Sequence, residues 1–244
     1  MISLLAAISF LTRIPTGRWM VFDEKQVARS AAWFPFVGAL IGALCALVAA
    51  LLRGRVPWPM TAVAVLIIET LITGALHLDG LADTADGFGG GKDRDDILRI
   101  MRDHAIGSYG GAAISLLIAL KLVAYSGVLQ RTDWLAAVIV TPSLGRWSLL
   151  LLTAGLPYAR STSSPARQMG KAPLFVGTVM IVVLLVAVRL ARAWAAAAAA
   201  VAVTVVFGLY CRRRIGGITG DTLGANLELC ESAALVLFVW ATRA

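Results

Sequence analysis

Acidic side chains are concentrated in one short segment of an otherwise acid-poor chain. Of the 14 Asp and Glu residues among 244, seven lie between positions 79 and 103. Asp79, Asp83 and Asp86 are spaced i, i+4 and i+7, so on a helix they point within about 60° of one another. Such carboxylates repel in a low dielectric unless a cation lies among them. Mg²⁺ prefers oxygen ligands and is usually held by one or two carboxylates plus substrate phosphates. The spacing therefore predicts a Mg²⁺ site.

Two other interpretations of these aspartates are open. They could form a solvated acidic face, although apolar residues such as Leu78, Leu81 and Ala82 alternate with them directly after an apolar segment. They could also line a proton or cation pathway, because carboxylates within membranes often mark one.

Glycines and basic residues follow the aspartates. The glycine-rich run 87–91 resembles a phosphate-binding P-loop only superficially, since Asp86 and Asp93 stand where that motif needs Gly and Ser or Thr. Basic residues that follow could stabilise phosphate charge or could simply mark a cytoplasmic loop. The candidates for phosphate binding are Lys92, Arg94 and Arg102.

The same loop ends with Asp103 and His104. Asp103 could complete the metal site through its carboxylate. His104 is a candidate for proton transfer or for contact with a phosphate, and a structural role is the alternative.

Three charged residues stand inside apolar segments, where a charge is costly and often functional. Glu69 either joins the metal site or pairs with Lys121 or Arg146. Arg146 follows Pro142 in what we expect to be a broken membrane span. It is therefore a candidate for a substrate cavity, and a structural ion pair is the alternative.

A second polar constellation occupies positions 216–231, directly after a run of three arginines. Its glycines allow a ligand to approach the backbone closely. Asp221, Asn226 and Glu228 are predicted to bind substrate, with Asp221 and Glu228 also candidates for a second metal. The alternative is an ordinary polar turn and helix cap.

The elements that position these residues are apolar helices. The chain is 59% hydrophobic and only 15% charged, whereas soluble domains are about a quarter charged. A membrane-spanning helix needs about 20 apolar residues. We therefore predict an all-α, polytopic transmembrane bundle of six or seven spans in a single domain, 1–244, with segment 1–14 at the interface or partly inserted. The predicted spans are 31–52, 59–76, 106–129, 134–156, 173–188, 194–211 and 227–241.

The basic residues predict the orientation in the membrane. With seven spans, 14 Lys and Arg residues fall on one side and six on the other. Loops rich in Lys and Arg stay in the cytoplasm, so the acidic loop and its site should face the cytoplasm. The formal charge of +8 is explained by this topology, and no nucleic-acid partner is expected.

Four stretches of the sequence resemble the cobalamin synthase family, the adenosylcobinamide-GDP ribazoletransferases. They are 10–15 (FLTRIP), 77–87 (HLDGLADTADG), 103–110 and 217–225 (GITGDTLGA). The resemblance implies a Mg²⁺-dependent enzyme of the bacterial or archaeal cytoplasmic membrane. Its substrates would be adenosylcobinamide-GDP and α-ribazole or α-ribazole 5′-phosphate, and its products adenosylcobalamin or its 5′-phosphate and GMP.

Each candidate residue then has an expected role in this reaction. Metal binding is expected of Asp79, Asp83, Asp86, Asp103 and Glu69, and direct catalysis of Asp83, Asp86 and His104. Substrate binding is expected of Lys92, Arg94, Arg102, Arg146, Asp221, Asn226 and Glu228. The rival functions are a cation-coupled transporter, with sites at the membrane midplane, and a nonenzymatic scaffold. Membrane lipid is an expected partner, and a homo-oligomer is left open.

Overall fold

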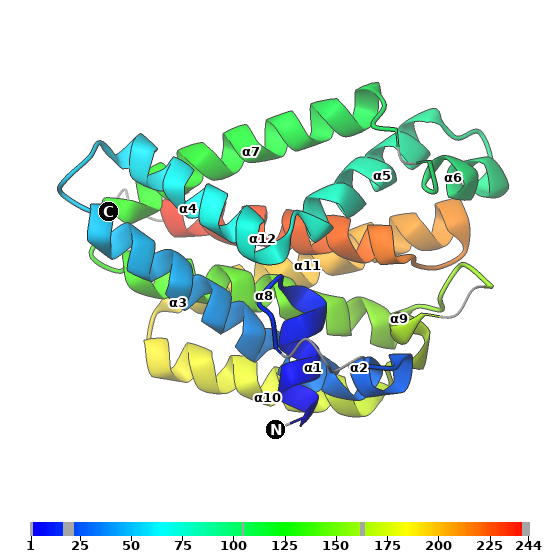
Figure 1. The fold of residues 1–244 in the computed structure, drawn as a ribbon, viewed down its shortest axis with the longest axis horizontal. Helices are drawn as coiled ribbons and strands as arrows, with labels where there is room; N and C mark the ends of the chain where they lie inside the picture. Colours follow the sequence, from blue (N-terminus) through cyan, green and yellow to red (C-terminus); the bar gives the residue numbers. More distant parts are fainter. Residues whose placement is uncertain (1, 17–21, 104, 162–163, 241–244) are drawn as a thin grey trace.

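The computed structural model describes residues 2–16, 22–103, 105–161 and 164–240 as a bundle of helices (Figure 1). Across these residues the only β-type pairing is an isolated bridge between Tyr158 and Ile218. Six helices are long and apolar enough to cross a membrane, or seven if one bent pair counts as a span. The predicted all-α fold and the predicted six or seven spans are therefore confirmed.

The bundle is built from short helices, long helices and one bent pair. Short helices are α1 (Ile2–Leu11), α2 (Glu24–Ser30), the 3-10 turn η1 (Ala31–Trp33), α6 (Arg94–Ile100) and α9 (Pro165–Gln168). The long helices are α3 (Phe34–Leu52), α7 (Ser108–Leu129), α8 (Trp134–Gly155), α10 (Lys171–Val188), α11 (Ala191–Ile215) and α12 (Gly220–Trp240). The bent pair is α4 (Trp58–Thr73) and α5 (Leu76–Gly90).

Helix α8 forms the centre of the bundle. It packs against α3, α10, α11 and α12, and 78% of its apolar stretch is buried inside the protein. For α10 the corresponding share is 17%, so most of its apolar surface faces outward. An apolar exterior of this kind is what a surrounding bilayer requires.

The break between α4 and α5 differs from the prediction. The predicted span continued to residue 76, but α4 ends at Thr73 and α5 leaves it at an angle of 89°. Gly74 and Ala75 both have left-handed backbone, with φ of +64° and +60°. Glycine adopts this conformation freely, whereas alanine does so only at a cost. The bend separates the aspartate-bearing helix from the apolar helix before it.

The expected break at Pro142 is wrong, because α8 runs unbroken through this residue. Proline leaves the carbonyl four residues earlier without its helical donor, and here that carbonyl belongs to Val138. Gly42 of α3 packs so closely that an added Cβ would lie 2.6 Å from the Val138 oxygen. Gly38 meets the Pro142 carbonyl in the same way. Gly38 and Gly42 therefore let α3 pack closely against α8.

The polar connections gather at one end of the bundle, on the right in Figure 1. Helices α5 and α6, the region of α9 and the turn from α11 to α12 all lie there. The short turns α3–α4, α7–α8 and α10–α11 lie at the opposite end. The two polar constellations of the sequence therefore lie at the same end of the molecule.

Candidate active site

The candidate site is built where α5 crosses α12. Two glycines at this crossing leave no room for a larger side chain. A Cβ on Gly80 would lie 2.8 Å from the Asp221 carbonyl oxygen, and a Cβ on Gly224 would lie 3.2 Å from the His77 Cα. Small residues let two helices approach closely. The crossing brings the HLDGLADTADG and GITGDTLGA stretches together, although about 130 residues separate them in the chain.

Three carboxylates lie around this crossing. Asp79 is exposed and Asp83 is half-buried on α5, and the charges of Asp79 and Asp221 both act on Asp83. Asp79 and Asp221 also line one cavity. The structure thus supplies oxygen donors from two helices, of the kind that suits a hard divalent ion.

Arg160 is a part of the site that the sequence reasoning missed. Its Nη2 atom donates to the Asp221 carboxylate at 2.8 Å, and Thr219 Oγ1 donates to the same oxygen at 3.2 Å. Arg160 lies in the connection between α8 and α9 and is one of the 14 basic residues on the side predicted to be cytoplasmic. The position of an arginine in a short polar loop does not show whether it belongs to a site or only reflects the membrane topology.

Asp86 occupies a different position from its two neighbours on α5. It is buried, and its carboxylate accepts hydrogen bonds from the backbone N–H groups of Gly107 at 2.7 Å and Gly110 at 2.8 Å. These are orphan donors at the start of α7, whose own N-cap side chain is missing. A carboxylate here also meets the positive end of the helix dipole. Asp86 thus joins α5 to α7.

The two remaining candidates of the acidic loop are Asp103 and His104. Asp103 is exposed, and its carboxylate accepts a hydrogen bond from the backbone of Ala105. His104 lies outside the described residues. Within the described part of the chain, no group of three or more His, Cys, Asp or Glu side chains is arranged to hold a metal ion.

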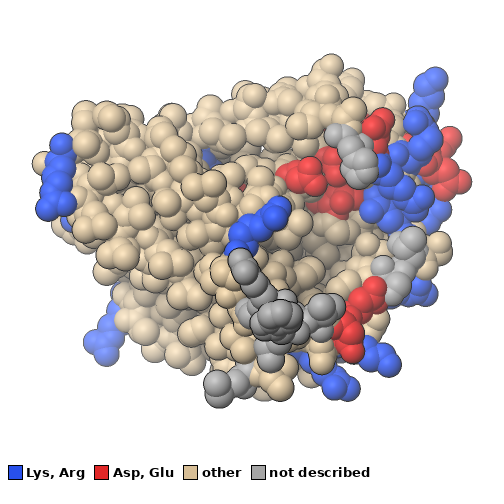
Figure 2. All heavy atoms as spheres, viewed as in Figure 1, with Lys and Arg blue, Asp and Glu red and all other residues tan. Residues whose placement is uncertain are grey.

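A basic groove lies beside the carboxylates. Its cavity is about 500 Å³, and its charged lining includes Arg94, Arg99, Arg102 and Arg160. Arg160 connects this groove to the carboxylates through its ion pair with Asp221. Lys92 is exposed but is not part of the lining. Figure 2 shows that acidic and basic side chains lie next to one another at the end of the molecule that holds α5 and α6.

Two groove-side residues are held by the protein itself. Arg94 donates to the backbone oxygens of Ile215 and Ala159, at 3.1 and 2.7 Å. On α6, the Arg99 guanidinium donates to Asp96 and lowers the pKa of that carboxyl below its usual value. The Arg94 contacts fix α6 against the end of α11 and the α8–α9 connection, whereas the Arg99–Asp96 contact lies within α6.

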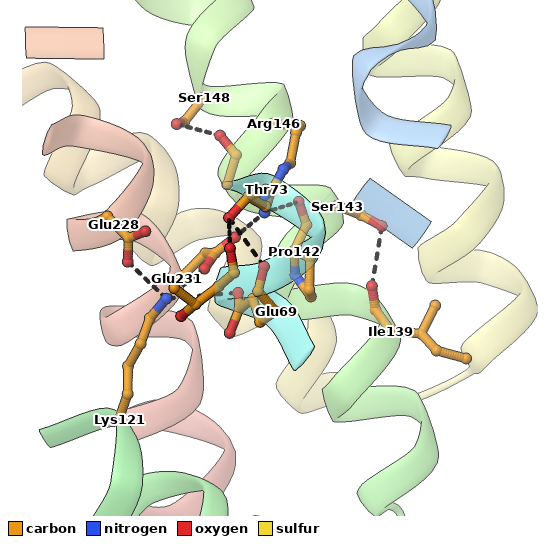
Figure 3. Close-up of polar contacts among 12 residues, drawn as sticks. Glu69, Thr73, Lys121, Ile139, Pro142, Ser143, Arg146, Ser148, Glu228 and Glu231 are labelled. Carbon is orange, nitrogen blue, oxygen red and sulfur yellow. Dashed lines mark hydrogen bonds and ion pairs between the residues drawn. The ribbon is translucent and has the colours of Figure 1, made fainter. Parts of the chain in front are cut away.

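The charged residues of the apolar segments form a separate buried ion cluster (Figure 3). Lys121 Nζ lies 2.6 Å from Glu231, 2.7 Å from Glu228 and 3.6 Å from Glu69. Arg146 pairs with Glu231. Of the two roles considered for Glu69 and for Arg146, the structure therefore shows the ion pair. The cluster joins α4, α7, α8 and α12 and leaves Glu228 bound to Lys121.

Asn226 also lies inside the bundle. Its amide nitrogen donates to Ser148 Oγ at 3.0 Å and Thr204 Oγ1 at 3.2 Å, and the residue is fully buried. Of the second polar constellation, the structure therefore places Asp221 with the α5 aspartates, and Asn226 and Glu228 in contacts within the bundle.

Comparison with known proteins gives a consistent result over nearly the whole chain. The family model described as cobalamin-5-phosphate synthase matches residues 3–239. A relative from Syntrophobacter fumaroxidans is 36% identical over 231 residues, covering 92% of this chain and 93% of its own. One from Rhizobium etli is 37% identical over 241 residues, covering 94% and 93%. Both are named adenosylcobinamide-GDP ribazoletransferase, and neither is named as a transporter.

No solved structure matches the chain. The family resemblance noted from the four sequence stretches is confirmed, because the match extends through the intervening helices as well. The chain belongs to the cobalamin-5-phosphate synthase family.

Proposed function

We propose that this chain joins adenosylcobinamide-GDP to α-ribazole or α-ribazole 5′-phosphate and releases GMP. The names of its relatives support this reaction. The structural observation that carries it is the pairing of Arg160 with Asp221, because it places a carboxylate group directly beside an arginine groove. That combination suits the transfer of a phosphoryl group between two oxygen atoms.

The reaction exchanges one bond to phosphorus for another. A ribose hydroxyl oxygen attacks the phosphorus atom nearer the corrinoid side chain. The bond from that phosphorus to the bridging oxygen of the pyrophosphate breaks, and GMP leaves with the bridging oxygen. The hydroxyl proton passes to a general base. Positioning and charge stabilisation supply most of the catalysis in such reactions.

The carboxylates at the helix crossing fit a Mg²⁺ ion. Asp79 and Asp83 would hold it, with Asp221 opposite, and substrate phosphates would complete the shell. Such sharing is compatible with the absence of a cluster of three acidic ligands among the described side chains. When bound, the ion would neutralise phosphate charge during the transfer.

Asp83 is the better candidate for the general base than Asp86, with one carboxylate oxygen for Mg²⁺ and the other for the proton. Both oxygens of Asp86 already accept backbone N–H groups, so proton uptake would cost the start of α7 its cap. Asp83 makes no such contact with the backbone of α7 and is half-buried at the crossing. His104 remains a prediction for proton transfer.

The arginine groove would bind the pyrophosphate. Arg102 and Arg99 are exposed along it, and guanidinium groups bind phosphate oxygens in pairs. We propose that this end of the bundle faces the cytoplasm and that the protein spans the cytoplasmic membrane. The excess of Lys and Arg on the same side supports that orientation.

Reconstitution tests the proposed function. The purified protein in lipid vesicles is given adenosylcobinamide-GDP, α-ribazole and Mg²⁺, and GMP and the corrinoid product are measured together. We expect equal amounts of both, and neither when either substrate or Mg²⁺ is omitted. A well-folded protein that forms no corrinoid product with either ribazole form would contradict the proposal.

A further inference from the structure

A small cavity, separate from the arginine groove, is lined in part by two of the carboxylates. Its volume is about 190 Å³, and residues of α1, α3, α5, α8, α9 and α12 surround it. Its walls are mainly apolar, with Phe10, Phe34 and Leu149 among them. Asp79 and Asp221 form part of its edge. The cavity therefore joins an apolar interior to the proposed reaction centre.

The walls suit a flat aromatic ligand. Phe10 and Phe34, both in the lining, have nearly parallel rings with centroids 5.8 Å apart and 12° between their planes, and aromatic groups pack favourably against other aromatic rings. A cavity of about 150 Å³ is enough to hold benzene, so this one can hold a somewhat larger ring system. It is much smaller than the roughly 300–1,000 Å³ of sites for drug-sized ligands, which excludes the corrinoid ring.

A buried histidine adds a polar contact to this cavity. His77 lines it and is only 4% exposed, and its Nδ1 atom has no hydrogen-bond partner. Buried polar atoms are normally paired, so an orphan of this kind needs an explanation. An aromatic base linked to ribose through one ring nitrogen keeps a second ring nitrogen that accepts a hydrogen bond. The Nδ1 atom of His77, when it carries the ring proton, is a donor available to that nitrogen.

We infer that this cavity binds the aromatic base of ribazole and that His77 is its hydrogen-bond partner. The inference rests on the proposed function and adds the position of one substrate. Asp221 belongs to the cavity edge, and its partner Arg160 belongs to the arginine groove. The base, the ribose hydroxyl and the pyrophosphate would then follow one another from the cavity, across the carboxylates, to the groove.

Filling the cavity tests this assignment. Ala166 lines it from the short helix α9, so Ala166→Phe puts a ring into the space without altering a long helix. Ala136→Phe is the matched control, since Ala136 is partly buried in α8 and lines neither this cavity nor the groove. We expect Ala166→Phe to raise the KM for α-ribazole about tenfold or more. The KM for adenosylcobinamide-GDP should stay at the wild-type value, which also shows that the variant is folded.

Substitution of His77 tests the polar contact. His77→Phe should raise the KM for α-ribazole, because the ring nitrogen of the base loses its donor. His77→Asn should restore part of the affinity, since its amide nitrogen can take the place of Nδ1. Equal KM values for α-ribazole in wild type, His77→Phe and His77→Asn would overturn the role of His77.

Direct binding separates this inference from the proposed function. Free benzimidazole is titrated onto detergent-solubilised protein by equilibrium dialysis. Protein-free detergent corrects for uptake into micelles, and Ala136→Phe, which leaves the cavity open, should bind like wild type. If the protein binds benzimidazole and Ala166→Phe abolishes binding, the cavity assignment stands even for a protein without transferase activity. If product forms but Ala166→Phe changes neither benzimidazole binding nor the KM for α-ribazole, the assignment is wrong and the proposed function stands.

Discussion

At the scale of single residues, the three aspartates of α5 divide into two environments. Asp79 and Asp83 face the crossing with α12, where the charge of Asp221 also acts. Asp86 is turned to the start of α7 and has both oxygens bonded to backbone N–H groups. Helical spacing alone puts all three on one face, and only the position of α7 distinguishes them.

Replacement of Asp86 should therefore reduce the unfolding free energy of the protein more than it reduces the catalytic rate. Loss of a helix cap costs about 0.5 to 2 kcal/mol, so Asp86→Ala is expected to lower the unfolding free energy by that amount. Asp86→Asn keeps one acceptor oxygen and should lose less. Thermal unfolding in detergent measures both. If Asp86→Ala unfolds at the wild-type temperature but loses all activity, Asp86 belongs to the reaction and its capping contacts are incidental.

At the scale of helices, the site depends on how closely α5 and α12 approach. Gly80 and Gly224 make that approach possible. A side chain at either position would push the two helices apart and move Asp79 and Asp83 away from Asp221. The separation of these carboxylates is thus set by glycine contacts rather than by the carboxylates themselves, which repel each other.

Gly80→Ala should weaken both packing and activity. Its new Cβ would lie 2.8 Å from the Asp221 carbonyl oxygen, and overpacking of this kind costs about 1 to 3 kcal/mol. Gly111→Ala is the matched control, since a Cβ there meets nothing within 4 Å and alanine favours a helix. We expect a lower melting temperature and lower kcat for Gly80→Ala only. Equal melting temperatures and equal kcat values for the two variants would show that activity does not require the close approach of α5 and α12.

The buried ion cluster has a structural role in the same helices. Lys121 of α7 contacts glutamates from α4 and α12, and removing one partner of a buried pair leaves uncompensated charge. Lys121→Met should therefore destabilise the protein by about 3 to 5 kcal/mol. Addition of Glu228→Gln should recover part of that loss.

Lys171→Met provides the control for Lys121, because Lys171 is exposed at the start of α10. The measurement is the unfolding temperature of the wild type and of Lys121→Met, Lys121→Met with Glu228→Gln, and Lys171→Met. A Lys121→Met protein as stable as Lys171→Met would contradict the structural role and favour a binding role for these glutamates.

Hydrophobic runs predicted most of these helices, because a membrane span has a minimum length and composition that a sequence displays directly. The 89° bend was not predictable, since Gly74 within an apolar run can continue a helix as well as end it. The continuity of α8 through Pro142 was not predictable either, because a proline can kink a helix without ending it.

The candidate site was predictable in part for a similar reason. Acidic spacing along one helix marked Asp79 and Asp83, and a polar glycine-rich segment marked Asp221. The Arg160–Asp221 pair and the separation of Glu228 from the aspartates follow from tertiary contacts. Charges that pair across the bundle carry no short-range pattern in the chain.

At the scale of the whole molecule, the charged loops place the site at one end of an apolar body. Arg55 lies in the α3–α4 turn at the opposite end from Asp95 of α6 (Figure 1). If the acidic end faces the cytoplasm, a membrane-impermeant maleimide should label Arg55→Cys in intact cells. Asp95→Cys should react only in inside-out vesicles.

The native cysteines give little background in this experiment, because Cys45, Cys211 and Cys230 are all buried. Labelling of Asp95→Cys from outside intact cells would reverse the proposed orientation. The site would then be separated from nucleotide-bearing substrates in the cytoplasm.

The most direct measurement of the central claim compares two carboxylate variants in the reconstituted reaction. Asp83→Asn removes a charge at the α5–α12 crossing, and Asp133→Asn removes one at the other end, where Asp133 pairs with Arg131 at 2.7 Å. Initial rates of corrinoid product formation are measured with saturating Mg²⁺, after thermal unfolding has shown that both variants are folded. We predict a loss of about a hundredfold or more for Asp83→Asn, with Asp133→Asn close to wild type. Near-wild-type activity of Asp83→Asn would contradict the account and place the reaction elsewhere in the molecule.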